Sequence, residues 1–140
     1  MVITFDGPAG AGKSTIARAV AKRLGFAFLD TGAMYRACTW AAVRAGIALD
    51  DAQAVVDLVR KLKLEIQDDG EAQHIRVDGR DVTTDIRSEA LARHIFHIAD
   101  PPAVRRELVL RQRQYAAGRD IVAEGRDQGT VVFPEAELKL

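Results

Sequence analysis

The sequence predicts an α/β fold in which a parallel sheet lies between layers of helices. Short apolar runs rich in β-branched and aromatic residues at 2–5, 26–29 and 121–123 are typical of buried strands. Between the first two runs, apolar residues recur at helical spacing from Ile16 to Leu24. A strand, a helix and a second strand in this order form a βαβ unit, whose strands are parallel. The arrangement predicted for the core is therefore a three-layer α/β/α sandwich.

The turn after the first strand contains a glycine-rich phosphate-binding motif. It has the spacing Gly, four free positions, Gly-Lys-Ser, and it lies between a strand and a helix as such a motif requires. Glycines allow successive backbone N–H groups to face phosphate oxygens, and the helix adds its positive N-terminal end. A glycine-rich turn that matches by chance is the alternative. The residues predicted to bind the phosphates of a nucleoside triphosphate are Gly7, Pro8, Ala9, Gly10, Ala11, Gly12, Lys13, Ser14 and Thr15.

Two members of this motif have distinct chemical roles. Lys13 is predicted to bridge the β- and γ-phosphates, and the Ser14 hydroxyl to face Mg²⁺, partly through water. The sequence therefore predicts ATP and Mg²⁺ at this site.

Composition limits the classes of partner. The chain has 140 residues, 48% of them hydrophobic, and a formal net charge of zero, which gives no reason to expect a nucleic-acid or membrane partner. Its one cysteine, Cys38, cannot form an internal disulfide, and no N-terminal signal precedes the first strand. We expect a cytoplasmic monomer that binds small nucleotides.

Residues 33–117 are predicted to form a helical region with a small antiparallel insert. Alternating apolar residues and two Asp-Gly turns predict a hairpin at about 63–83, and Ser88 is expected to cap a helix that extends to Phe96. The parallel-sheet core is then residues 1–32 and 118–140. His94 and His97 lie one helical turn apart, but no third ligand joins them, so we interpret them as surface residues rather than a metal site.

Two further polar turns follow predicted strands. Residues 30–36 follow the second strand and residues 124–130 follow the third, at the strand ends where open α/β sheets bind ligands. Arg36 can grip a phosphate with two hydrogen bonds, although an arginine on a helix is often only solvated. The later turn can alternatively be a charged loop closed by its own ion pair.

Three motifs together closely resemble the bacterial cytidylate kinase family. They are the phosphate loop, Asp-Thr-Gly-Ala-Met-Tyr-Arg at 30–36, and Glu-Gly-Arg-Asp-Gln-Gly-Thr-Val-Val-Phe-Pro at 124–134. The likeness extends over the whole chain and implies a P-loop NTPase fold of the nucleoside monophosphate kinase type. It also implies transfer of the γ-phosphoryl group of MgATP to CMP or dCMP.

The resemblance assigns roles to individual residues. Arg36 and Arg126 resemble the arginines that hold the acceptor phosphate and, with Lys13, are the expected catalytic residues. Arg105 and Asp127 resemble the pair that reads cytosine, and a carboxylate suits the N4 amino group of that base. The remaining residues expected at the CMP site are Thr31, Gly32, Tyr35 and Gly125.

Two departures from the family pattern modify these expectations. Phe96 stands where the family usually has a serine that assists cytosine recognition, which predicts weaker discrimination between cytosine and uracil. The chain also stops where relatives continue into a further strand, a lid and a C-terminal helix. We therefore expect a single kinase core that lacks its C-terminal part and is a poor kinase by itself.

Two other functions remain open from the sequence. One is a different P-loop kinase that acts on AMP, shikimate or a sugar acid. The other is a nucleotide-binding module without catalysis, although the Asn-Lys-x-Asp segment of GTP-binding switches is absent from the sequence.

Overall fold

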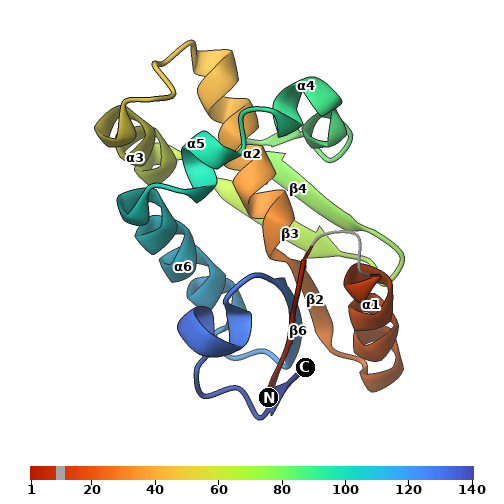
Figure 1. Cartoon of the computed structure of the whole chain (residues 1–140). Helices are drawn as coiled ribbons and strands as arrows, with labels where there is room; N and C mark the ends of the chain where they lie inside the picture. Colours follow the sequence, from red (N-terminus) through yellow and green to blue (C-terminus); the bar gives the residue numbers. More distant parts are fainter. Residues whose placement is uncertain (9–11) are drawn as a thin grey trace. The chain divides into compact units, whose positions relative to one another are not determined.

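The computed structural model describes residues 1–8 and 12–140 (Figure 1). Contacts divide the chain into two compact units. The first comprises residues 1–32, 68–73 and 111–140, and the second comprises residues 33–67 and 74–110. Among the described residues, no helix combines the length and the apolar character that crossing a bilayer would require.

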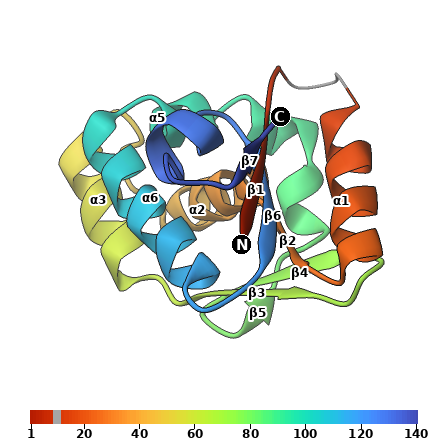
Figure 2. The ribbon, with the colours of Figure 1, turned by 90° about the horizontal axis from the view of Figure 1, so that it is seen from below.

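The first unit contains the parallel sheet. Its strands are β1 (Val2–Asp6), β2 (Ala27–Asp30), β6 (Ile121–Gly125) and β7 (Leu138–Lys139), in the order β2-β6-β1-β7. All three pairings in this sheet are parallel, as Figure 2 lets the reader follow. The predicted α/β class with a parallel sheet is confirmed.

Helix α1 (Lys13–Leu24) packs on this sheet. Its buried residues Ala17 and Ala21 form one apolar cluster with Ile3, Phe28 and Val122 from the three longer strands. The helix ends before Gly25, as the sequence predicts. The apolar periodicity of the sequence therefore corresponds to the face that α1 buries.

Most of the helices lie in the second unit. Helix α2 (Thr31–Ala45) starts directly after β2 and leaves no turn between them, although Thr31 and Gly32 still belong to the first unit. Helix α3 (Ala52–Lys61) begins where the Asp51 carboxylate accepts a hydrogen bond from the Ala54 amide at 3.1 Å. Helix α6 (Pro102–Ala116) runs from the second unit into the first.

The predicted insert is a small antiparallel sheet. It consists of β3 (Leu64–Asp68), β4 (Gln73–Val77) and β5 (Arg80–Asp81), in that order. Strands β4 and β5 are antiparallel, with Val77 opposite Arg80. The small antiparallel insert expected from the sequence is present.

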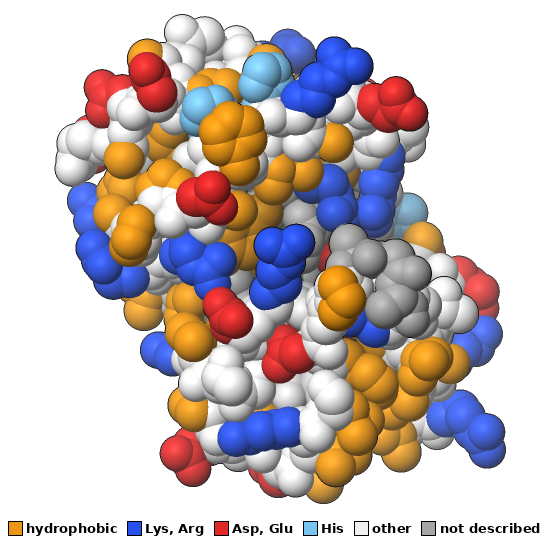
Figure 3. All heavy atoms as spheres, viewed as in Figure 1, with side chains coloured by type: hydrophobic (Ala, Val, Ile, Leu, Met, Phe, Trp, Pro, Cys, Tyr) orange, Lys and Arg blue, Asp and Glu red, His pale blue; other side chains and the backbone are white. Residues whose placement is uncertain are grey.

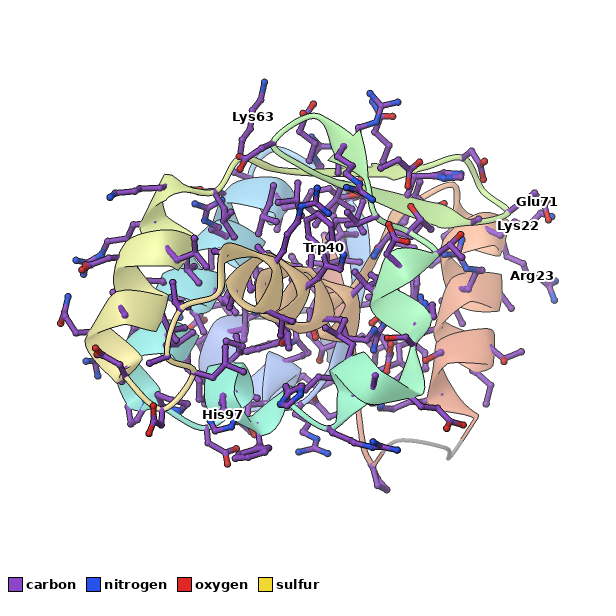
Figure 4. All side chains as sticks on the ribbon, turned by 90° about the horizontal axis from the view of Figure 1, so that it is seen from above. Lys22, Arg23, Trp40, Lys63, Glu71 and His97 are labelled. Carbon is purple, nitrogen blue, oxygen red and sulfur yellow. The ribbon has the colours of Figure 1, made fainter. Side chains whose placement is uncertain are left out.

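The turn between β3 and β4 belongs to the first unit and is bound to it by side chains. The Arg18 guanidinium lies 3.0 Å from the Asp68 carboxylate, and the Lys22 ammonium lies 2.7 Å from that of Glu71. Figure 4 shows Lys22 and Glu71 pointing toward one another. The Gln73 carboxamide accepts a hydrogen bond from the Asp30 amide at 2.9 Å.

The helix predicted after Ser88 is shorter than expected. Two short helices, α4 (Glu89–Ala92) and α5 (Phe96–Ala99), replace it, and the 3₁₀ helix η1 (Asp85–Arg87) ends just before Ser88. The Ser88 hydroxyl does accept the Leu91 amide at 3.1 Å, so the predicted cap is present. Between α4 and α5 the amides of His94 and Ile95 bond to the carbonyl groups three residues back, which tightens the backbone and interrupts the α-helix.

Candidate functional site

The carboxyl ends of three strands lie side by side in the first unit. Glu124 of β6 is in register with Phe5 of β1 on one side and with Asp30 of β2 on the other. The chain therefore leaves all three strands on the same side of the sheet, at their carboxyl ends. The segments that follow are the phosphate loop after β1, Thr31 after β2 and the turn after Gly125. Open α/β sheets bind ligands at the carboxyl ends of their strands.

The phosphate-loop lysine is paired with a buried acid. Lys13 Nζ lies 2.6 Å from Glu124 Oε1, and the two side chains are only 15% and 5% exposed. Lys13 is the first residue of α1, and Gly12 before it has φ 76° and ψ 5°, a left-handed conformation that glycine adopts without strain. Ser14 and Thr15 are exposed, and the predicted phosphate contacts of Ala9, Gly10 and Ala11 lie outside the described residues.

Glu124 is a functional candidate that the sequence analysis missed as a partner of Lys13. A carboxylate at the end of the strand beside the phosphate-loop strand is the type of residue that assists Mg²⁺ in P-loop enzymes. The signal was an acid directly after a predicted strand. The neighbouring position of β6 and β1, more than 110 residues apart in the chain, becomes visible only in the fold.

The turn after β6 is held by the carboxylate of Asp6. Asp6 accepts the backbone amides of Gln128 and Gly129 at 2.7 and 2.9 Å, one on each carboxylate oxygen. The Asp127 backbone in this turn is in the left-handed helical region, with φ 57° and ψ 22°. The π-helix η2 (Gln128–Val132) begins immediately afterwards, so Asp6 binds the N–H groups at its start.

Buried side chains fix the same turn from inside the unit. Gln128 Nε2 lies 3.1 Å from the carbonyl oxygen of Arg126, 3.2 Å from Gln112 Oε1 and 3.5 Å from Thr31 Oγ1. Thr31 in turn donates its hydroxyl hydrogen to the carbonyl oxygen of Glu124 at 2.9 Å. No local motif in the sequence indicates this network, because its members come from distant parts of the chain.

The close contact between Thr31 and the turn explains one glycine. A Cβ atom on Gly125 would overlap Thr31 Oγ1 and would lie 3.2 Å from Gln128 Nε2. Glycine at this position therefore permits the approach of the two strand ends.

Five of the predicted acceptor residues belong to the same unit. Thr31, Gly32, Gly125, Arg126 and Asp127 lie in the first unit. Thr31 and Gly125 are buried, whereas the side chains of Arg126 and Asp127 are exposed.

The other predicted acceptor residues belong to the second unit. Tyr35 and Arg36 lie on α2 and are partly buried. Arg105 on α6 donates a hydrogen bond to the carbonyl oxygen of Ala99 at 3.3 Å. Their roles, like those of the first-unit residues, stay predictions.

Arg113 of α6 binds the segment that follows β6. Arg113 donates from Nε to the Val132 carbonyl and from Nη2 to the Val131 carbonyl, both at 2.9 Å. These are carbonyl groups at the end of η2, so Arg113 holds the far end of the segment whose start Asp6 binds.

His94 is exposed and His97 is partly buried, and the centroids of their rings lie 6.3 Å apart. On the face drawn in Figure 3, histidine side chains lie beside hydrophobic ones. The His97 ring lies 4.0 Å from that of Phe96, which is 54% exposed. Within the described part of the chain, no group of three or more His, Cys, Asp or Glu residues is arranged to hold a metal ion.

Comparison with known proteins agrees with the motifs. Residues 3–140 match the family model described as cytidylate kinase. A cytidylate kinase of Rhodopirellula baltica (strain DSM 10527 / NCIMB 13988 / SH1) is 53% identical over 140 residues, which cover 100% of this chain and 59% of the relative. A cytidylate kinase of Geobacillus sp. (strain WCH70) is 46% identical over 138 residues, 99% of this chain and 62% of the relative.

A longer relative contains a similar segment. The bifunctional pantoate ligase/cytidylate kinase of Synechococcus sp. (strain JA-2-3B'a(2-13)) is 51% identical over 142 residues, which cover 99% of this chain and 26% of the relative. The chain spans about 60% of the length of the two cytidylate kinases above. From the family match over nearly its whole length, the chain belongs to the cytidylate kinase family.

Proposed function

We propose that the protein to which this chain belongs transfers the γ-phosphoryl group of MgATP to CMP or dCMP. The observation that carries the proposal is that Lys13, Thr31 and the Gly125–Asp127 turn lie together at the carboxyl ends of the parallel strands. Phosphoryl transfer requires the donor and acceptor phosphates to be aligned in line. Residues that bind both phosphates at the same end of the sheet suit that requirement.

Lys13 and its neighbours form the donor side in this proposal. The Lys13 ammonium, now paired with Glu124, is a cation that triphosphate oxygens can share or take over. The Ser14 hydroxyl and the Glu124 carboxylate are oxygen ligands of the kind that Mg²⁺ prefers, so these residues fit a magnesium nucleotide. Bound Mg²⁺ would supply neutralisation of phosphate charge.

The acceptor side consists of the residues assigned by family resemblance. Arg36 and Arg126 bind the phosphate of the monophosphate, and Thr31 and Gly125 shape its surroundings. Asp127 accepts from the cytosine N4 amino group, a position where the uracil carbonyl would be repelled. Phe96 cannot form the hydrogen bond of the family serine, so we propose that selectivity depends on Arg105 and Asp127.

Calorimetric titration of the 140-residue chain with CMP, dCMP, UMP and AMP tests this function. Binding of CMP or dCMP in preference to AMP is expected, with loss of the preference in Asp127→Asn. The asparagine variant keeps the left-handed backbone tolerable and preserves the shape of the side chain, so it isolates the charge. Circular dichroism of both proteins checks that the variant is folded.

The alternatives predict different results. Preferred binding of AMP, shikimate or a sugar acid would identify another P-loop kinase. Binding of MgATP with no monophosphate would favour a nucleotide-binding module. The monomeric state and cytoplasmic location stay predictions.

A further inference from the structure

We propose that Gln128 is a positioning residue of the acceptor site, which orients Arg126 and Asp127 through the hydrogen bond to the carbonyl group between them. This inference rests on the function proposed above. It goes further because neither the motifs nor the family resemblance gave Gln128 a role.

The first argument is the set of groups that the Gln128 carboxamide joins. Its Nε2 lies within hydrogen-bond distance of Thr31 Oγ1 at the end of β2, the Arg126 carbonyl after β6 and Gln112 Oε1 on α6. An amide nitrogen has two hydrogens, so three acceptors compete for them and the shorter two contacts dominate. Those two connect the turn to the helix.

The second argument concerns what the Arg126 carbonyl controls. It belongs to the peptide group that links Arg126 to Asp127, so fixing it fixes the direction in which both side chains leave the backbone. The left-handed Asp127 makes this peptide a place where the chain reverses. Asp6 holds the next two amides, and the turn is therefore fixed on both sides of Asp127.

The third argument is energetic. Gln128 and Gln112 are 1% and 0% exposed, and Gln128 Oε1 and Gln112 Nε2 have no hydrogen-bond partner among the residues that the structure describes. Burying polar atoms without partners is unfavourable, and an apolar pair of similar shape would often be as stable. Stability alone therefore does not account for two glutamines here, whereas orientation of the turn does.

Three variants separate positioning from stability. Gln128→Met keeps the shape and removes the donor, and Gln112→Met/Gln128→Met removes both polar partners. Gln114→Met makes the same chemical change at an exposed position of α6 and serves as the matched control. For each protein we would measure the midpoint of urea unfolding, the affinities for CMP and MgATP, and amide hydrogen exchange across residues 125–129.

The single variant is expected to unfold at lower urea, because Gln112 loses its partner. The double variant is expected to regain most of that midpoint, yet to bind CMP about tenfold more weakly than the native chain, the loss of roughly one hydrogen bond's free energy. MgATP affinity should stay within about twofold, because Lys13 is not in the Gln128 network. Exchange at residues 125–129 should become faster in both variants and stay unchanged in Gln114→Met.

Native CMP affinity in the double variant, or unchanged exchange across residues 125–129, would overturn the positioning role. A native chain that binds no monophosphate would instead overturn the function proposed above. In that case hydrogen exchange still decides whether Gln128 orders the turn.

Discussion

On the proposed donor side, Lys13 forms an ion pair with Glu124. On the proposed acceptor side, the turn after β6 is held by hydrogen bonds that involve Asp6, Gln112 and Thr31. Lys13 comes from a local motif that is readable in the sequence. The turn depends on residues up to 123 positions away in the chain. The comparison shows that a local loop is enough to place the charged Lys13 side chain. The orientation of the turn after β6, in contrast, depends on residues from distant parts of the chain.

The largest effect is expected where the acceptor side is tightest. Gly125→Ala should reduce the free energy of unfolding by about 3 kcal/mol, because the new methyl group would overlap Thr31 Oγ1. Adding Thr31→Ala should recover part of the loss, since Gln128 Nε2 would still lie 3.2 Å away. Urea denaturation of the two variants and of Thr31→Ala measures this; equal stability of Gly125→Ala and the native chain would contradict the close contact.

On the donor side, stability and binding should separate. Glu124→Gln leaves Lys13 largely buried without its counter-charge and should cost about 2–3 kcal/mol. In Lys13→Met/Glu124→Gln most of that stability should return, while MgATP affinity is lost. Thermal unfolding measures the stability and calorimetry measures the MgATP affinity. A double variant that binds MgATP with native affinity would contradict the proposed role of Lys13.

Asp6 connects the two sides, because it precedes the phosphate loop and binds the turn. Asp6→Asn keeps one oxygen acceptor of the two and should cost about 1–2 kcal/mol. The change should also weaken CMP binding. An unchanged urea midpoint would show that water replaces the lost bond, and Asp57→Asn at an exposed position of α3 provides a control.

Two substitutions of Asp127 separate the effect of its left-handed backbone from the effect of its side-chain charge. Asp127→Ala should unfold about 1 kcal/mol more easily than Asp127→Asn, because alanine tolerates the left-handed region less well. Both variants should lose the preference for cytosine to a similar extent. Equal stability of the two would indicate that the turn rearranges without the aspartate.

The smallest expected effect is a shift in the pKa of Asp81, a residue of the antiparallel sheet that belongs to neither the donor side nor the acceptor side. Hydrogen bonds from the Thr83 side chain and backbone hold the pKa of the Asp81 carboxyl below its ordinary value. A carboxyl group with a lowered pKa in the folded state stabilises the protein above its unfolded pKa, and this contribution disappears as pH falls through the folded pKa. Thr83→Val should move the Asp81 pKa upward in an NMR titration; an unmoved value would assign the effect to the backbone amide alone.

Much of the fold was predictable because its signals are local. The strands at 2–5, 26–29 and 121–123 follow from apolar runs, and the insert follows from alternation and Asp-Gly turns. The helix after Ser88 was predicted too long, because periodicity does not reveal the tightened turns near His94. Among candidate site residues, Lys13 was predictable from its motif, whereas its contact with Glu124 was not.

The missing part of the prediction has one physical cause. Asp6 and Glu124 lie at strand ends, Gln128 lies in the turn after β6 and Gln112 lies on α6. Their partners are distant in the chain, and only the folded arrangement of these elements brings them together. The sequence shows that each is polar, yet it does not show which partner each will meet.

The side chain of Gln73 has a consequence for solubility. Strand β2 is at the edge of the parallel sheet, and the Gln73 carboxamide both accepts the Asp30 amide at 2.9 Å and donates to the Asp30 carbonyl at 3.4 Å. It pairs with that residue as the peptide group of a neighbouring strand would. Exposed edges invite pairing with other molecules and hence aggregation. Gln73, the first residue of β4, thus shields the end of β2 from a foreign strand.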